Sequence, residues 1–122
     1  GGEIARLMLS LKAMISGAVK LPTIIFDEID TGVSGKIAEK MANIMKEMGD
    51  NDRQVISITH LPQIAALGTT HYKVDKEDTS EATISKMTIL NEEERIKEIA
   101  QMLSGSDISD AAINNAKELL RL

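Results

Sequence analysis

The sequence predicts an α/β fold in which parallel strands with flanking helices are followed by a β-hairpin and two carboxy-terminal helices. Short, continuous apolar runs at residues 23–27 and 54–59 lie on either side of an amphipathic segment. That order is typical of a strand–helix–strand unit whose two strands are parallel. Farther along, two β-rich runs are joined by a polar stretch, and two helical patterns follow them.

The composition limits the class of protein. The 122 residues are one domain's length or a piece of a larger one. Aromatic residues are only 2%, so aliphatic side chains and methionines such as Met41, Met45 and Met48 are expected to fill the core rather than line a partner groove. The absence of cysteine excludes disulfides and thiolate metal sites. The net charge of −5, with no membrane-length apolar run or signal segment, favours a cytoplasmic protein without a membrane partner.

The first half of the chain predicts two helices and two strands. A first amphipathic helix is expected over residues 3–19, where apolar residues recur at helical spacing: Ile4, Leu7, Met8, Leu11, Met14, Ile15 and Ala18. Residues 23–27 follow as a strand of the type covered on both faces. The next helix is closed by Gly49, and its apolar positions are Ile37, Met41, Ile44, Met45 and Met48. A turn at residues 49–52 then leads to the second strand at 54–59.

The second half predicts a hairpin and a helical pair. Pro62 begins a short helix over residues 61–67. Residues 71–76 and 82–90 form the hairpin around the polar residues 77–81. Asn91 has the character of a helix N-cap with Glu94 as its return partner, and Ser109 caps a last helix. The apolar faces of these helices are Ile96, Ile99, Ala100 and Leu103, then Ile113, Ala116, Leu119 and Leu120. The last helix could close its own core or dock on another part of the protein.

Polar side chains follow both predicted parallel strands. Asp27 and Glu28 come after the first strand, and Thr59 and His60 after the second. Ligands of open parallel sheets gather at the carboxyl ends of the strands, so these groups are expected along one edge. One carboxylate could hold Mg²⁺, its neighbour could take a proton from a water, and the imidazole could bind a phosphoryl group. The residues therefore predict Mg²⁺-dependent phosphate chemistry.

Four segments, taken together, resemble motifs of the ABC-type ATPases. TIIFDE (23–28) is similar to the Walker B strand, and GGEIARLMLSLKAMI (1–15) to the second part of the signature motif and its helix. IDTGVSG (29–35) falls where the D-loop lies, and ITHLPQIAA (58–66) where the switch histidine lies. FDEIDTGVSGKIAEKM (26–41), ITHLPQIAALGTTHYKV (58–74) and ERIKEIAQML (94–103) resemble the SMC-like branch, in particular its bacterial DNA-repair ATPases. The resemblance covers essentially the whole chain.

The resemblance implies roles for the residues at the strand ends. It implies that Asp27 orients Mg²⁺ and its water, that Glu28 is the general base, and that His60 contacts the γ-phosphate of ATP. The signature segment Gly1, Gly2 and Glu3 would face the ATP held by a partner head. Glycine N–H groups at a helix start suit that task, because they attract anions and allow close approach.

The D-loop implied by the resemblance crosses the dimer interface and consists of Asp30, Thr31, Gly32, Val33 and Ser34. Ser34 stands where the family commonly has Asp, which puts contacts of that Asp in doubt, and it could simply cap the following helix. No G-x-x-x-x-G-K-[ST] motif occurs, and the Ser expected before Gly1 is not present. Residues 1–122 are therefore expected to be the carboxy-terminal lobe of a P-loop NTPase head, inactive without its P-loop half.

The resemblance also implies partners. These are ATP and Mg²⁺, the amino-terminal half of the same head with its P-loop and coiled coil, a second head in a homodimer, and DNA through the full-length protein. The expected role is repair and recombination at DNA double-strand breaks, with nucleoid association during damage. Two alternatives stay open: a phosphoacceptor receiver domain, which needs about five alternating β/α units, and a non-catalytic head dimerisation module. His71 has no metal-ligand partner at useful spacing, which favours a structural role.

Overall fold

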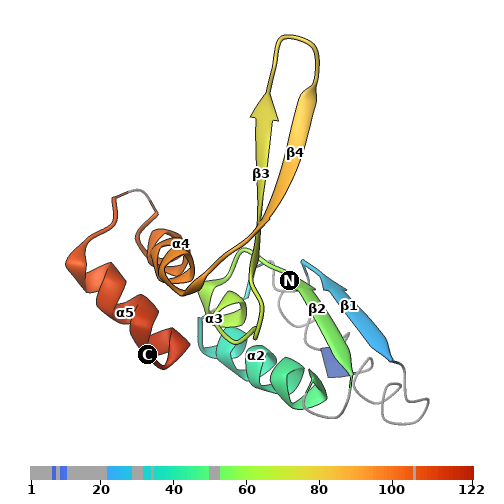
Figure 1. The fold of residues 1–122 in the computed structure, drawn as a ribbon. Coiled ribbons are helices and arrows are strands. Elements are labelled where there is room, and N and C mark those ends of the chain that lie inside the picture. Colours follow the sequence, from blue (N-terminus) through green and yellow to red (C-terminus); the bar gives the residue numbers. More distant parts are fainter. Residues whose placement is uncertain are drawn as a thin grey trace.

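The computed structural model describes residues 7, 9–10, 22–28, 32–33, 35–49, 53–105 and 107–122. The elements follow one another as β1 (Thr23–Asp27), α2 (Gly35–Gly49), β2 (Gln54–Ile58), α3 (Pro62–Ala65), β3 (Tyr72–Asp78), β4 (Thr83–Ile89), α4 (Glu92–Ser104) and α5 (Asp110–Leu120) (Figure 1). Their order and types confirm the predicted fold class. Across the described part of the chain, no helix has both the length and the apolar character needed to cross a membrane.

The amino-terminal body is a parallel strand pair with α2 on one face. β1 and β2 pair from Thr23 opposite Gln54 to Asp27 opposite Ile58. The side chains of Ile24 and Phe26 point toward α2 and are buried in one apolar core. The predicted methionine filling is confirmed, since the remaining buried members of this core include Met41, Met45 and Met48. Phe26 is fully buried, so this pair of layers has a well-packed centre despite the low aromatic content.

The opposite face of the same strand pair is exposed. Ile25, Ile56 and Ile58 lie on this face and are 53%, 41% and 49% exposed. The prediction that residues 23–27 form a strand covered on both faces is therefore wrong for this chain. A continuous apolar run does indicate that both faces avoid water, but it does not say which chain segment covers each one.

The first predicted helix lies mostly outside the described residues. Leu7, Leu9 and Ser10 are helical; residues 3–6, 8 and 11–19 are not among those described. Leu9 belongs to the core, whereas Leu7 is 61% exposed. Since residues two apart differ by about 200° around a helix, these two leucines face opposite sides. Placing Leu7 on the buried face was therefore wrong.

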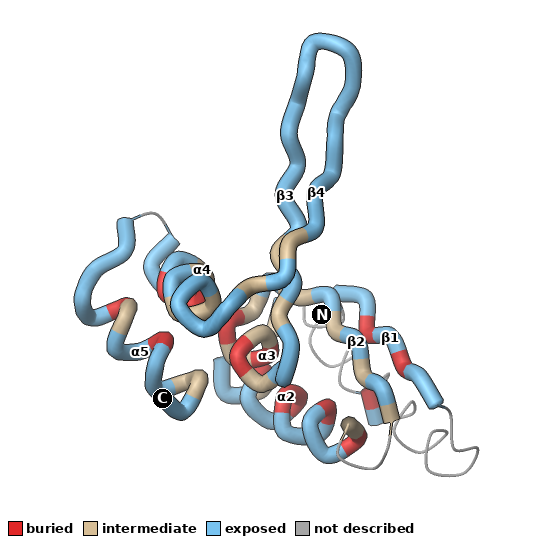
Figure 2. Tube along the Cα trace, viewed as in Figure 1, coloured by how far each residue is buried: buried red, intermediate tan, exposed pale blue. Residues whose placement is uncertain are grey.

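The predicted hairpin is confirmed and extends away from the body (Figure 1). β3 and β4 pair antiparallel from Tyr72 opposite Ile89 to Asp78 opposite Thr83. The first strand ends two residues later than predicted, at Asp78, where Thr79 closes a tight end. Its hydroxyl donates to Ala82 O (2.7 Å) and accepts from Ala82 N (3.1 Å). Most of the hairpin is exposed on both faces (Figure 2).

The last two helices pack against each other. The predicted cap of α4 is confirmed: Asn91 Oδ1 accepts from Glu94 N (2.9 Å), and Glu94 Oε1 accepts from Asn91 N (3.0 Å). Ser109 Oγ likewise accepts from Ala112 N (3.1 Å) at the start of α5. Buried small and branched residues make the contact between the helices: Ile99, Ala100, Ala112 and Ala116. Leu103, expected on the buried face, is instead 36% exposed near the end of α4.

Candidate functional site

The carboxyl ends of β1 and β2 form the candidate site. Asp27 is the last residue of β1 and lies opposite Ile58, the last residue of β2. The ladder continues for one more bond, because Glu28 N donates to Ile58 O at 2.9 Å. Glu28 and His60 therefore leave neighbouring strands at the same sheet edge, where open parallel sheets place their ligands.

Glu28 has an unusual backbone conformation. Its φ of 51° is in the left-handed region, which only one other non-glycine residue among those described adopts, Arg121 at the end of α5. For a residue with a long side chain this conformation costs about 1–2 kcal/mol. It turns the chain sharply at the strand end. Strain of this kind is concentrated at functional sites, where surrounding contacts hold it in place.

His60 and Glu28 are in direct contact. His60 Nε2 lies 2.6 Å from Glu28 Oε1, and the two side chains are 84% and 48% exposed. An ionised carboxylate can only accept hydrogen bonds, so the imidazole N–H donates and Nε2 carries the hydrogen. The turn that holds His60 is fixed by Thr59, whose Oγ1 accepts from Leu61 N at 2.9 Å. A carboxylate oriented by an imidazole and open to solvent is suited to general-base chemistry.

The described residues could provide only part of the coordination shell of a magnesium ion. Asp27 is exposed beside Glu28. Within the described ranges, no three carboxylate or imidazole side chains converge on a common point. Mg²⁺ usually keeps several waters and takes one or two protein carboxylates plus substrate phosphates. Asp27 could thus serve as one ligand, but these residues do not enclose the ion.

The remaining predicted site residues are mostly outside the described part of the chain. Gly1, Gly2, Glu3, Asp30, Thr31 and Ser34 are the predicted site residues that fall there. Gly32 is described, with a φ of 75° that favours glycine. Val33 is half-buried and packs against the core beside α2. The structure thus brings Glu28 and His60 together with Asp27 adjacent, and the D-loop is described only at its middle.

An arginine that the sequence reasoning missed holds the segment after His60. Arg95 Nη2 of α4 donates to the carbonyl oxygens of Ala65 (3.2 Å), Ala66 (3.3 Å) and Gly68 (2.8 Å). Burial lowers the pKa of Arg95. No periodic pattern links residues 27 to 30 positions apart, so only the folded structure could reveal this contact.

His71 lies close to the same arginine at the base of the hairpin. Burial lowers the pKa of the His71 imidazole, nearby Arg95 lowers it further, and Glu98 opposes the shift. Its backbone carbonyl accepts from Leu90 N at 2.9 Å, which closes the hairpin. These surroundings support the structural role expected for His71.

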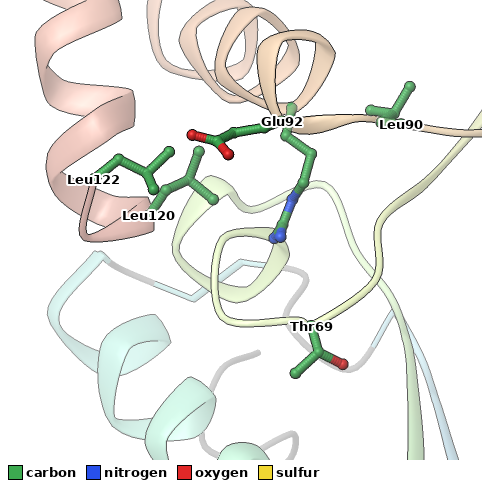
Figure 3. Close-up of a pocket in the computed structure, with 6 residues that line it drawn as sticks. Thr69, Leu90, Glu92, Leu120 and Leu122 are labelled. Atoms are coloured by element: carbon green, nitrogen blue, oxygen red, sulfur yellow. The ribbon is translucent and has the colours of Figure 1, made fainter.

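A half-open cavity lies elsewhere on the molecule. It has a volume of about 270 Å³ between α4, the end of α5 and the loop after α3, and Figure 3 shows its lining: Thr69, Leu90, Glu92, Arg95, Leu120 and Leu122. None of the predicted site residues lines it. Among the residues that the structure describes, the candidate site is therefore an exposed sheet edge.

Comparisons with known proteins identify relatives along the whole chain. No protein-family model matches. The chain is 38% identical over 122 residues to the DNA repair protein RecN of Haemophilus influenzae, covering 100% of this chain and 22% of that protein. It is 40% identical over 121 residues to RecN of Bacillus subtilis, covering 99% of this chain and 21% of that protein. For RecN of Rickettsia conorii the identity is 43% over 122 residues, covering 100% and 22%. The chain thus spans about a fifth of these relatives' length.

Solved structures agree with the sequence comparison. A structure described as concerning ATP-driven dimerization and DNA stimulated activation of SMC ATPases matches with a TM-score of 0.71 and 25% identity, covering 85% of this chain and 62% of that one. The Smc head domain with a coiled coil and joint from Pyrococcus yayanosii matches with a TM-score of 0.72 and 25% identity, covering 85% and 19%. We conclude that the chain is similar over its whole length to a segment of the RecN proteins, about a fifth of their length, and that it has the fold of the SMC head domains.

Proposed function

We propose that this chain is the carboxy-terminal half of an SMC-like, ABC-type ATPase head that hydrolyses ATP with Mg²⁺ at a dimer interface. The contact between Glu28 and His60 at the ends of two parallel strands is the observation that carries the proposal. The longer protein would couple this activity to repair and recombination at DNA double-strand breaks in the cytoplasm. The similarity to RecN supports this role.

In this proposal Glu28 is the general base and His60 orients it; when ATP binds, the same imidazole N–H would turn to the γ-phosphate. The imidazole N–H fixes one carboxylate oxygen of Glu28 before substrate binds. The carboxylate can then accept a proton from a water directed at the γ-phosphate. When bound beside Asp27, Mg²⁺ would supply positive charge against the phosphate oxygens. Preorganising Glu28 in this way reduces the rearrangement needed during reaction.

The amino-terminal half of the same head is the first partner that we propose. The 122 residues contain no phosphate-binding P-loop motif, so another segment must hold the nucleotide. The exposed isoleucines Ile25, Ile56 and Ile58 support this, because a parallel sheet ordinarily has both faces covered. A second head would complete the ATP site through residues 1–3 and the D-loop, and DNA would bind through the full-length protein.

The receiver-domain alternative is less compatible with the fold. A receiver needs about five alternating β/α units. After two parallel strands, the described chain continues with an antiparallel hairpin and a helical pair instead. The dimerisation-module alternative differs in activity and is separated from ours by the following experiment.

Glu28→Gln in the complete protein tests the proposal. ATP turnover should fall by about 10²- to 10⁴-fold, the usual contribution of a general base, while ATP binding persists. Glu39→Gln is a matched control, since Glu39 is an exposed acid on α2. Steady-state hydrolysis and nucleotide-binding titrations measure both quantities. If Glu28→Gln binds and hydrolyses ATP like the parent, the acid is not catalytic and a dimerisation module becomes the better account.

A further inference from the structure

Arg95 occupies a place from which it can control the position of His60. The chain passes from β2 through Thr59 and His60 directly into α3. His60 therefore lies in a short connection between the end of β2 and the start of α3. Any shift of α3 changes the direction in which the chain leaves the strand.

α3 is too short to be stable without contacts to the rest of the fold, and it has them through buried Pro62 and Ile64 on one side and through Arg95 at its end. It has four residues, and isolated helices of that length are unstable in water. Its N-terminus has no side-chain cap. The carbonyl groups at a helix end need partners from elsewhere. Arg95 is the partner of three carbonyl groups at and just after the end of α3. Its Nη2 atom donates to all three, and the shortest of these hydrogen bonds, to Gly68 O, is 2.8 Å long.

The position of Arg95 is itself fixed by the packing and capping of α4. It follows the capping box of α4, and its backbone N donates to Asn91 O at 2.8 Å. α4 in turn packs on α5 through buried Ile99 and Ala100. A positive group on the carboxyl end of a helix is also favoured by the helix dipole.

We propose that Arg95 is a positioning residue for the candidate ATPase site. Its guanidinium fixes the end of α3 and thereby keeps His60 within hydrogen-bonding distance of Glu28. The inference rests on the proposed function, because it concerns the same hydrolytic site. It adds that a polar side chain, beside the apolar packing of Ala65 and Ala66 on the helical pair, links α4–α5 to the proposed catalytic edge.

A double-mutant cycle in the complete protein tests this inference. Four forms are compared: the parent, Arg95→Gln, His60→Ala and the double variant. Arg95→Gln should lower kcat for ATP roughly tenfold, since small misplacements of catalytic groups cost this much or more. The Kd for nucleotide should change less than about twofold, because Arg95 does not touch the proposed nucleotide site. In the His60→Ala background, Arg95→Gln should have almost no further effect on kcat.

The control is Lys97→Gln, which removes one positive charge from an exposed position on the same helix and should leave kcat unchanged. An equal loss from Arg95→Gln in both backgrounds would mean general destabilisation and overturn the inference, as would no loss at all. If Arg95→Gln does not fold, the same cycle with Arg95→Lys decides, because lysine keeps the charge without the planar fork. Failure of the proposed function is distinct: then neither Glu28→Gln nor His60→Ala lowers turnover.

Discussion

Glu28 combines a costly backbone conformation with a side chain that meets His60 across the sheet edge. The φ of 51° persists because Glu28 N is bonded to Ile58 O and the carboxylate to His60. Glycine would adopt the same φ without a steric cost. The presence of Glu at this position therefore fits our proposal, in which the site requires the carboxylate of residue 28.

Glu28→Gly tests whether strain is stored at this residue. Removing the side chain should raise the free energy of unfolding by about 1 kcal/mol, since glycine tolerates positive φ. Urea denaturation measures the change. Glu39→Gly, inside α2, should instead lower the free energy of unfolding by about 1 kcal/mol. A loss of stability at Glu28 equal to that at Glu39 would show that no strain is relieved.

The elements were predictable where their signal is local. Apolar periodicity identified both parallel strands and α2, and cap chemistry placed the starts of α4 and α5 at Asn91 and Ser109. The pairing of Asp27, Glu28 and His60 at one edge followed from the parallel topology. The contact of Arg95 with α3, the exposure of Ile25 and the side on which Leu9 packs could not be predicted. These depend on how distant segments meet, which periodicity does not encode.

The junction between the hairpin and α4 depends on ionisable groups. Lys73 Nζ on β3 lies 2.8 Å from Glu98 Oε2 on α4. The hydrogen bond to Glu98 raises the pKa of Lys73, so the contact further favours the charged ammonium group. His71, at the same junction, has its pKa lowered mainly by burial. The hairpin is therefore joined to the helical pair by a charged contact beside a histidine that folds in its neutral form.

Acidification should weaken the fold through His71. Its folded-state pKa is lowered from 6.5, so the unfolded chain binds the proton more readily. The contribution of neutral His71 is complete above pH 6.5 and is lost as the pH falls from 6.5 through the lowered pKa. Thermal or urea unfolding between pH 7 and 5 measures the decline. His71→Gln should make the slope smaller in that range; parallel curves for parent and variant would contradict the assignment.

At the scale of the whole molecule, the chain has the features of one half of a site. Asp27, Glu28 and His60 lie at an exposed edge, and the cavity beside Arg95 is not lined by them. The apolar sheet face with Ile25, Ile56 and Ile58 is exposed in the same body. With Glu28 as the proposed general base and no phosphate-binding loop motif, the chain is expected to work only when another segment adds the nucleotide.

The most direct test is MgATP hydrolysis by this chain mixed with its natural amino-terminal half, measured beside each part separately and with Glu28→Gln. The account predicts turnover in the mixture, none from this chain by itself, and loss of that turnover in the variant. A mixture that assembles and binds ATP without Glu28-dependent turnover would contradict it. So would appreciable Glu28-dependent hydrolysis by this chain without the other half.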